Sequence, residues 1–265
     1  ISSAATRERD KFHIKKHIAN GIELHDVTDD YCVLGLFGPK SRDLISNLSK
    51  DNFSNEKFEF ASAKNINIDG IKIWAQRLSY VGELGFELYI KTCDAKQIYE
   101  LIIKKGKNYN LSNCGMHAMD IMRMESGFLH WGHDISPEEN QYEAGLNFTI
   151  SYKKKIDFIG KQALEKIKNK KQNKRFIMLT LKESSPGQPL LLHDEPIYLK
   201  DKIIGVTTSG NYSFNYNKNI SFGYVKSEYS NEELEKMDLY IEVAKQKYPA
   251  KVEITPLKSK QTKSL

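Results

Sequence analysis

Ser79-Tyr-Val-Gly-Glu-Leu-Gly-Phe-Glu87 is the stretch that most narrows the fold and the function of this chain. Strand-forming residues flank it on both sides, which is typical of two strands joined by a turn. It carries one phenol, Tyr80, and two carboxylates, Glu83 and Glu87. A phenol offers a flat face and a hydroxyl, and a carboxylate can accept two parallel N–H bonds, as it does from arginine. The stretch therefore predicts a binding site for a flat, nitrogen-rich heterocycle.

Length and composition place the chain among globular proteins. Its 265 residues are enough for one large domain or two ordinary ones, and 40% hydrophobic with 28% charged residues favours a packed core over disorder. No apolar run approaches the ~18 residues of a membrane span, and residues 1–20 lack the apolar segment of a signal peptide. Because the first residue is Ile1, we expect the chain to be a fragment, a processed product or the ordered part of something longer.

The cysteines indicate a reducing compartment. There are three, Cys32, Cys93 and Cys114, and an odd number without a CxxC pair argues against a disulfide framework. We therefore expect each cysteine to be a small buried hydrophobe and the protein to be cytoplasmic.

The net charge of +6 is concentrated in one segment. Residues 153–175 hold ten Lys or Arg against two acids. Such a segment can bind nucleic acid, but it lacks interleaved aromatics and any fold motif for that role. A solvated linker helix is the favoured interpretation, and a landing surface for an anionic small-molecule tail is a third. We therefore expect neither a nucleic-acid nor a membrane partner.

Apolar periodicity predicts an α+β domain up to about residue 150. Asp69-Gly70 is a strong hairpin signal, and Gly21 and Gly127 are placed to end helices. The predicted elements are helices at 6–19, 40–48, 94–105 and 114–127, strands at 22–26 and 31–37, a hairpin at 66–78, and the strand-turn-strand around Tyr80.

Beyond the basic segment the pattern changes to short, regularly spaced strands, which indicates a small barrel or sandwich. The strand candidates are 175–182, 189–192, 196–200, 203–209, 219–226, 238–244 and 249–255. The predicted organisation is a first domain at 1–152, a basic linker at 153–174 and a C-terminal β domain at 175–258.

Three further parts of the sequence contain residue types that can carry chemistry. The segment His130-Trp-Gly-His-Asp134 could hold a metal, but no cysteine cluster or HExxH helix supports it, so packing and hydrogen bonding are favoured and no metal is expected. Arg123 is either a salt-bridged helix arginine or a residue that faces the site and orients a carboxylate. Residues 205–210 are bracketed by glycines but have neither P-loop nor dinucleotide spacing.

Several motifs, taken in order, resemble the glycine cleavage T-protein (aminomethyltransferase) family. The stretch from Tyr80 to Glu87 is similar to the tetrahydrofolate-binding signature of that family. The other matching segments are Leu34-Gly-Leu-Phe-Gly-Pro-Lys40, Asp120-Ile-Met-Arg-Met-Glu-Ser-Gly127, Tyr142-Glu-Ala-Gly-Leu146, Asp157-Phe-Ile-Gly-Lys-Gln-Ala-Leu164 and Thr208-Ser-Gly210. Each is short, and their order along nearly the whole chain carries the resemblance. It implies a T-protein-like folate-binding domain, incomplete at its N-terminus, followed by a small C-terminal antiparallel β-barrel.

The variant Phe128-Leu-His-Trp-Gly-His-Asp134 resembles one subgroup, the folate-binding C-terminal half of dimethylglycine and sarcosine dehydrogenases. In that subgroup a separate flavin domain oxidises an N-methyl amine to an iminium. The folate domain then captures the carbon as 5,10-methylenetetrahydrofolate. The resemblance thus implies tetrahydrofolate as cofactor and the iminium as reaction partner. It implies FAD only if a flavin domain precedes this chain, because the chain has no GxGxxG fingerprint.

The resemblance also implies roles for individual residues. Glu87 would hold the amino and N3 hydrogens of the pterin, Tyr80 would line the pocket, and Arg123 would be a less central pocket residue. The catalytic aspartate of the family is expected N-terminal to residue 1, together with the first strands of the domain. Loss of those strands would expose a sheet edge, so we expect the isolated chain to be poorly soluble or to bind folate weakly.

The resemblance leaves other functions open. One is a stand-alone aminomethyltransferase that meets a lipoyl carrier protein, against which the Phe128–Asp134 variant argues. Another is a folate-binding protein of the same fold without transfer chemistry. A demethylase that acts on a sulfonium is a further alternative, because the folate motif does not distinguish methyl donors.

Overall fold

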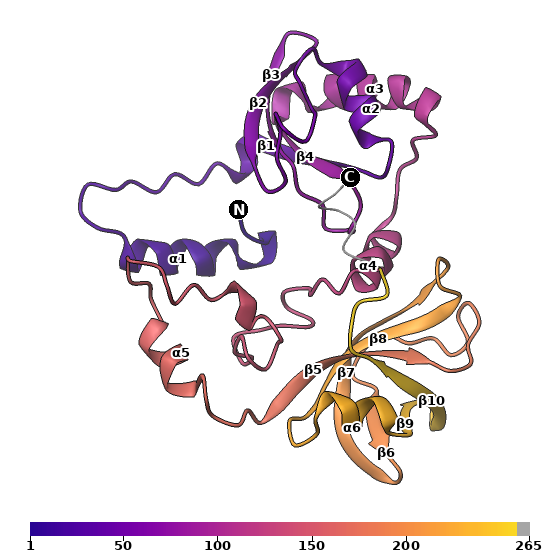
Figure 1. The fold of residues 1–265 in the computed structure, drawn as a ribbon. Helices are drawn as coiled ribbons and strands as arrows, with labels where there is room; N and C mark the ends of the chain where they lie inside the picture. Colours follow the sequence, from indigo (N-terminus) through magenta and orange to yellow (C-terminus); the bar gives the residue numbers. More distant parts are fainter. Residues whose placement is uncertain (259–265) are drawn as a thin grey trace. The chain divides into compact units, whose positions relative to one another are not determined.

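The computed structural model describes residues 1–258, which divide into two compact units (Figure 1). Unit 1 is Ile1–Asn113, and unit 2 begins at Cys114. Each unit has its own fold and is described by itself.

Unit 1 is built on a four-stranded antiparallel sheet with the strand order β1-β4-β3-β2. Its elements are α1 (Arg7–His17), β1 (Tyr31–Phe37), α2 (Ser41–Leu48), β2 (Ala63–Ile68), β3 (Ile71–Gln76), β4 (Gly85–Lys91) and α3 (Ala95–Gly106). The predicted hairpin is confirmed, because Ile68 pairs with Ile71 across Asp69 and Gly70, whose φ angles of 53° and 82° suit a tight hairpin turn.

The two faces of this sheet differ in character. Alternate residues of β4, among them Phe86 and Leu88, are fully buried in one hydrophobic core. Leu44 of α2 and Ile98 of α3 belong to the same core, so these two helices cover that inner face (Figure 1). The β4 residues that alternate with these buried ones point to the opposite side of the sheet, because side chains alternate along a strand. We call this opposite side the outer face; it carries Glu87.

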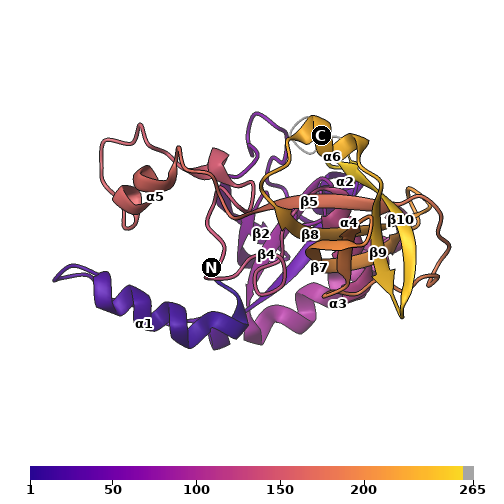
Figure 2. The same ribbon diagram turned by 90° about the horizontal axis from the view of Figure 1, so that it is seen from below.

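Unit 2 contains a closed barrel with the strand order β10-β5-β8-β7-β6-β9. Its strands β5, β7, β8, β9 and β10 can be followed in Figure 2. Its elements are α4 (Met116–Glu125), α5 (Lys161–Ile167), β5 (Lys174–Leu181), β6 (Pro196–Leu199), β7 (Lys202–Ser213), β8 (Lys218–Lys226), α6 (Asn231–Lys236), β9 (Leu239–Val243) and β10 (Gln246–Glu253). All barrel pairs are antiparallel. The α+β class and the C-terminal antiparallel barrel are therefore confirmed.

Helix α4 belongs to the same compact unit as the barrel. Ile121 and Met124 on α4 pack against Met178, Ile220 and Phe222 of the barrel strands. The compact units thus divide between residues 113 and 114, whereas the predicted domains divide at 152 and 174. The boundaries of a compact unit, which are set by spatial contacts, need not coincide with those of a domain defined by sequence. The predicted domain boundaries therefore stay a prediction.

Two predicted strands are wrong. Residues 22–26 form no strand, and Asp26 instead bonds Arg7 and Thr28, so the segment is held by side chains rather than by a ladder. Residues 189–192 are also irregular. Leu191 is buried, but it lies across β7, where a Cβ on Gly210 would come within 2.5 Å of the Cβ of Leu191. The apolar residues at 189–192 are therefore explained by the burial of Leu191 against β7 and not by strand pairing.

Other expectations need smaller corrections. Helix α1 forms as predicted, but its apolar residue Phe12 is 71% exposed and α1 buries no residue. Cys93 and Cys114 are exposed, so the expectation of buried cysteines is wrong for these two, which lie outside the strands and core helices. Within the basic segment the helix is limited to α5. Through residue 258, no helix combines the length and the apolar character that crossing a membrane requires.

Candidate functional site

Glu87 lies on the outer face of the sheet, on the inner strand β4. Glu87 is paired with Gly35 of β1 on one side and with Gln76 of β3 on the other. Directly opposed residues of antiparallel strands project to the same face, so the Gln76 side chain lies beside that of Glu87. Glu87 is half-buried, and Gly35 adds no side chain next to it.

A tyrosine two residues further along β4 orients this carboxylate. The Tyr89 hydroxyl donates a hydrogen bond to Oε2 of Glu87 at 2.7 Å. Burial, and next the hydrogen bond to Glu87, raises the pKa of the Tyr89 hydroxyl, so it stays protonated and remains a donor at neutral pH. Between residues 1 and 258, this is the hydrogen bond that the structure records for the Glu87 side chain. The carboxylate therefore keeps acceptor positions for a ligand.

An aromatic ring lies beside the carboxylate. The ring of Phe37 covers Gly35 and Gly85, where an added Cβ would come within 2.7 Å and 2.4 Å of ring atoms. Both glycines are thus required for the close approach of this ring. Trp74, paired with Tyr89, is 50% exposed on the same face, and Val33 is 49% exposed. A carboxylate beside an aromatic ring on a flat sheet suits a flat heterocycle with N–H groups on its edge.

The turn that carries Tyr80 connects β3 to β4, as predicted. Tyr80 is half-buried, and Gly82 has a φ of 67°, a conformation that favours glycine. The backbone N–H of Gly38 (2.8 Å) and the Ser41 hydroxyl (3.1 Å) both donate to the carbonyl of Leu84. The structure thus joins two stretches that the sequence singled out separately, the Gly-Pro turn and the Tyr80 turn.

A small cavity borders the same turn but is too small for a heterocycle. Its volume is about 10 Å³, room for roughly one water molecule. It is lined by Phe60, Arg77, Leu78, Ser79, Glu83, Leu84 and Gly85. Glu83 faces this cavity, and Glu87 does not.

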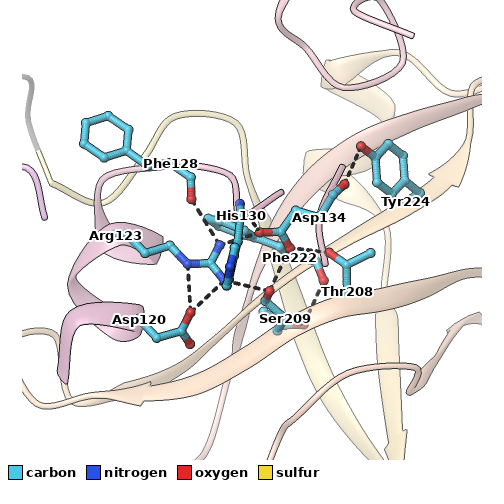
Figure 3. A network of polar contacts seen from close by, with 10 residues as sticks. Asp120, Arg123, Phe128, His130, Asp134, Thr208, Ser209, Phe222 and Tyr224 are labelled. Carbon is cyan, nitrogen blue, oxygen red and sulfur yellow. Dashed lines mark hydrogen bonds and ion pairs between the residues drawn. The ribbon is translucent and has the colours of Figure 1, made fainter. Parts of the chain in front are cut away.

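Arg123 belongs to unit 2 and is held there by a dense polar network (Figure 3). Its side chain is 1% exposed. The guanidinium contacts Asp120 through Nε and Nη2, Asp134 and the Phe128 carbonyl through Nη1, and the Ser209 hydroxyl through Nη2, at 2.5–3.1 Å. These five contacts match the five N–H groups of arginine. The salt-bridged alternative therefore describes Arg123 well, and its role at a ligand stays a prediction.

Asp134 is the acceptor at the centre of this network. Its side chain is fully buried and takes hydrogen bonds from Arg123, from the backbone N–H of His130 (2.9 Å), and from the hydroxyls of Thr208 (2.6 Å) and Ser209 (2.8 Å). The network thus ties α4, the turn at residues 130–134 and strand β7 together (Figure 3).

Three histidines near this network lie close to one another, with their rings tilted. The rings of His130 and His133 lie 4.6 Å apart, and His193 lies 6.5 Å from His133. Burial, followed by the charges of His133 and Arg123, lowers the pKa of His130, so this imidazole is neutral at physiological pH. In the part of the chain that the structure describes, no group of three or more His, Cys, Asp or Glu side chains is arranged to hold a metal.

The sequence interpretation missed three residues of the outer face: Phe37, Gln76 and Tyr89. Tyr89 could have been found from the sequence, since it lies two residues after Glu87 and shares its face. Phe37 and Gln76 could not, because their approach to Glu87 depends on the pairing of β4 with strands distant in sequence.

Two family models match successive parts of the chain. The GCVT N-terminal domain matches residues 1–154, and the glycine cleavage T-protein C-terminal barrel domain matches residues 174–258. The chain belongs to the glycine cleavage T-protein family. The resemblance that the ordered motifs indicated is therefore confirmed.

Relatives of this T-protein-family chain include dehydrogenases, an oxidase and aminomethyltransferases. The mitochondrial dimethylglycine dehydrogenase of Rattus norvegicus is 36% identical over 236 residues, 89% of this chain and 27% of that protein. The aminomethyltransferase of Listeria innocua is 32% identical over 256 residues, 97% of this chain and 67% of that protein. The chain thus spans about a quarter of the dehydrogenase and about two thirds of the aminomethyltransferase.

A solved structure has the same fold. The glycine cleavage system aminomethyltransferase T of Bartonella henselae superposes with a TM-score of 0.79. The match covers 96% of this chain and 67% of that structure at 21% sequence identity. At this identity the likeness establishes the T-protein fold.

Proposed function

We propose that this chain is the tetrahydrofolate-binding part of a one-carbon-transfer enzyme. The enzyme captures the carbon of an N-methyl amine, of the dimethylglycine or sarcosine type, as 5,10-methylenetetrahydrofolate. The observation that carries the proposal is Glu87, a carboxylate that Tyr89 orients and that keeps acceptor positions on the outer face of the unit 1 sheet. The chain's similarity to dimethylglycine dehydrogenases at up to 36% identity supports this choice of amine.

The residues of the outer face fit a reduced pterin. Its edge carries two adjacent N–H donors, the 2-amino group and N3–H, which match the two oxygens of a carboxylate. The Phe37 ring beside Glu87 offers a flat surface for the bicyclic ring. Tyr80, on the turn between β3 and β4, would line the pterin site. Tetrahydrofolate, when bound, supplies the nitrogens that take up the carbon. The part of this chain is to bind and orient that cofactor.

The proposal includes a division of labour within a longer protein. A flavin domain that carries FAD would oxidise the amine to the iminium, and the folate site would receive the iminium carbon. We place this activity in the cytoplasm, with folate and the iminium as its partners and without nucleic acid or membrane.

A stand-alone aminomethyltransferase is a second candidate, which the match to the Listeria innocua protein supports equally well. A protein that binds folate without transfer chemistry is a third. Product analysis of the full-length protein, incubated with dimethylglycine or sarcosine and tetrahydrofolate, separates them. We expect 5,10-methylenetetrahydrofolate to form at the expense of free formaldehyde. Formation only from an aminomethylated lipoyl carrier protein would support the second candidate, and folate binding without either product the third.

Tyr89→Phe is expected to weaken tetrahydrofolate binding about fivefold. The substitution removes the hydroxyl that holds Oε2 of Glu87, at a cost of about 1 kcal/mol, while the ring still packs against the sheet. Calorimetric titration of the full-length protein would measure the change. In a Glu87→Gln background the same substitution should have a much smaller effect, because the two residues act through one contact. Equal losses in both backgrounds would contradict the positioning role of Tyr89.

A further inference from the structure

Gln76 carries an unused amide next to the proposed pterin ligand. It is the residue of β3 that pairs directly with Glu87, and it is half-buried. No hydrogen bond from the Gln76 side chain to any of residues 1–258 is present, although an amide group has two donors and an acceptor. The half-buried amide of Gln76 lies beside the carboxylate of Glu87, which also keeps acceptor positions. Together the two side chains form one continuous polar edge.

The spacing of this edge suits a single ring. Directly opposed residues on antiparallel strands have Cβ atoms about 4.5–5.5 Å apart. Trp74 and Tyr89 form the next pair along the same two strands and flank the polar pair with aromatic surface. From Glu87 toward Gln76 the face therefore presents two acceptor oxygens and then an amide donor.

We propose that Gln76 binds the 4-oxo group of the pterin. This inference rests on the proposed function, in which Glu87 accepts from the 2-amino group and from N3–H. The next group along that pterin edge is the 4-oxo oxygen, an acceptor. The amide N–H of Gln76 donates to it, so the donor-donor-acceptor edge of the ring meets the acceptor-acceptor-donor edge of the protein.

Two substitutions at Gln76 have opposite consequences for two ligands. Gln76→Leu removes the donor at similar volume and should weaken tetrahydrofolate binding about tenfold, the effect of one unmade hydrogen bond at a partly buried site. Gln76→Glu places a second carboxylate against the 4-oxo oxygen and should weaken tetrahydrofolate binding further. The same Gln76→Glu variant should bind the 4-amino analogue of tetrahydrofolate more tightly than the wild type does, because a charged carboxylate is a stronger acceptor from an amino group than the neutral amide oxygen of Gln76.

A matched control lies on the same face. Asn65 pairs with Trp74 from the far side, on β2, and is exposed. Asn65→Leu makes the same kind of change, amide to isobutyl, at a position that no part of the proposed contact uses. Its tetrahydrofolate affinity should equal that of the wild type.

The experiment is calorimetric titration of the full-length protein and these variants with tetrahydrofolate and with its 4-amino analogue. A loss for tetrahydrofolate in Gln76→Leu, with a gain for the 4-amino analogue in Gln76→Glu, is the expected result. If Glu87→Gln loses tetrahydrofolate while both Gln76 variants bind as the wild type does, the role of Gln76 is overturned and the proposed function stands. If the wild type shows no saturable tetrahydrofolate binding, both are overturned.

Discussion

Arg123→Met is expected to lower the free energy of unfolding of unit 2 by about 3–5 kcal/mol. The substitution leaves the fully buried Asp134 carboxylate without its cation and frees Asp120 and Ser209 from their contacts with the guanidinium. Breaking a buried pair by removing one partner is costly because the remaining charge stays desolvated. Urea unfolding, followed by the fluorescence of Trp131 in a Trp74→Phe background, would report on unit 2.

An exposed ion pair of the same unit is the control. Lys161 contacts Asp157 at 2.7 Å, but the Asp157 side chain is 84% exposed. Lys161→Met should therefore change stability by less than about 1 kcal/mol. Arg123→Lys should recover only part of the loss, because an ammonium has three donors and lacks the planar fork. A loss of less than about 1 kcal/mol in Arg123→Met would contradict the structural role given to this network.

Glu87→Gln is expected to weaken tetrahydrofolate binding by about 100-fold, on the order of 3 kcal/mol. The amide has nearly the volume of the carboxylate, but it removes the charge and turns an N–H donor toward the N–H groups of the ligand. Titration calorimetry of the full-length variant measures the loss, and thermal unfolding checks that unit 1 keeps its stability.

The second carboxylate of the same stretch offers the matched control. Glu83 lies in the turn and lines the small cavity, whereas Glu87 does not line it. Glu83→Gln makes the same chemical change four residues earlier and should leave the affinity within about twofold, less than one hydrogen bond contributes. The reverse pattern, with affinity lost in Glu83→Gln and kept in Glu87→Gln, would contradict the assignment and identify Glu83 as the residue that binds the pterin.

Local signals in the sequence were sufficient for much of unit 1. Asp69-Gly70 set the hairpin, and the alternation of apolar residues set which face of β4 is buried. Glu87 could be predicted as a ligand because its short motif is self-contained, and that role stays a prediction. The same local reasoning failed at residues 22–26, where residues that favour a strand do not pair with any other strand.

Contacts between distant parts of the chain could not be predicted. Ser209, which accepts from Arg123 and donates to Asp134, lies 86 residues from Arg123. The sequence showed an arginine among apolar residues and left its role open, because burial and all its acceptors arise from packing α4 on the barrel. Gln76 could not be identified from the sequence for a related reason, because its place beside Glu87 follows from the β3–β4 register.

Fluorine NMR of the full-length protein labelled with 5-fluorotryptophan tests the central claim most directly, namely that a reduced pterin binds the outer face beside Glu87. The chain has two tryptophans, and Trp74 lies on this face, paired with Tyr89. A Trp74→Phe variant assigns its resonance. The account predicts that tetrahydrofolate shifts this resonance saturably and that Glu87→Gln abolishes the shift at the same ligand concentration. Saturable binding that leaves the Trp74 resonance unmoved would contradict it.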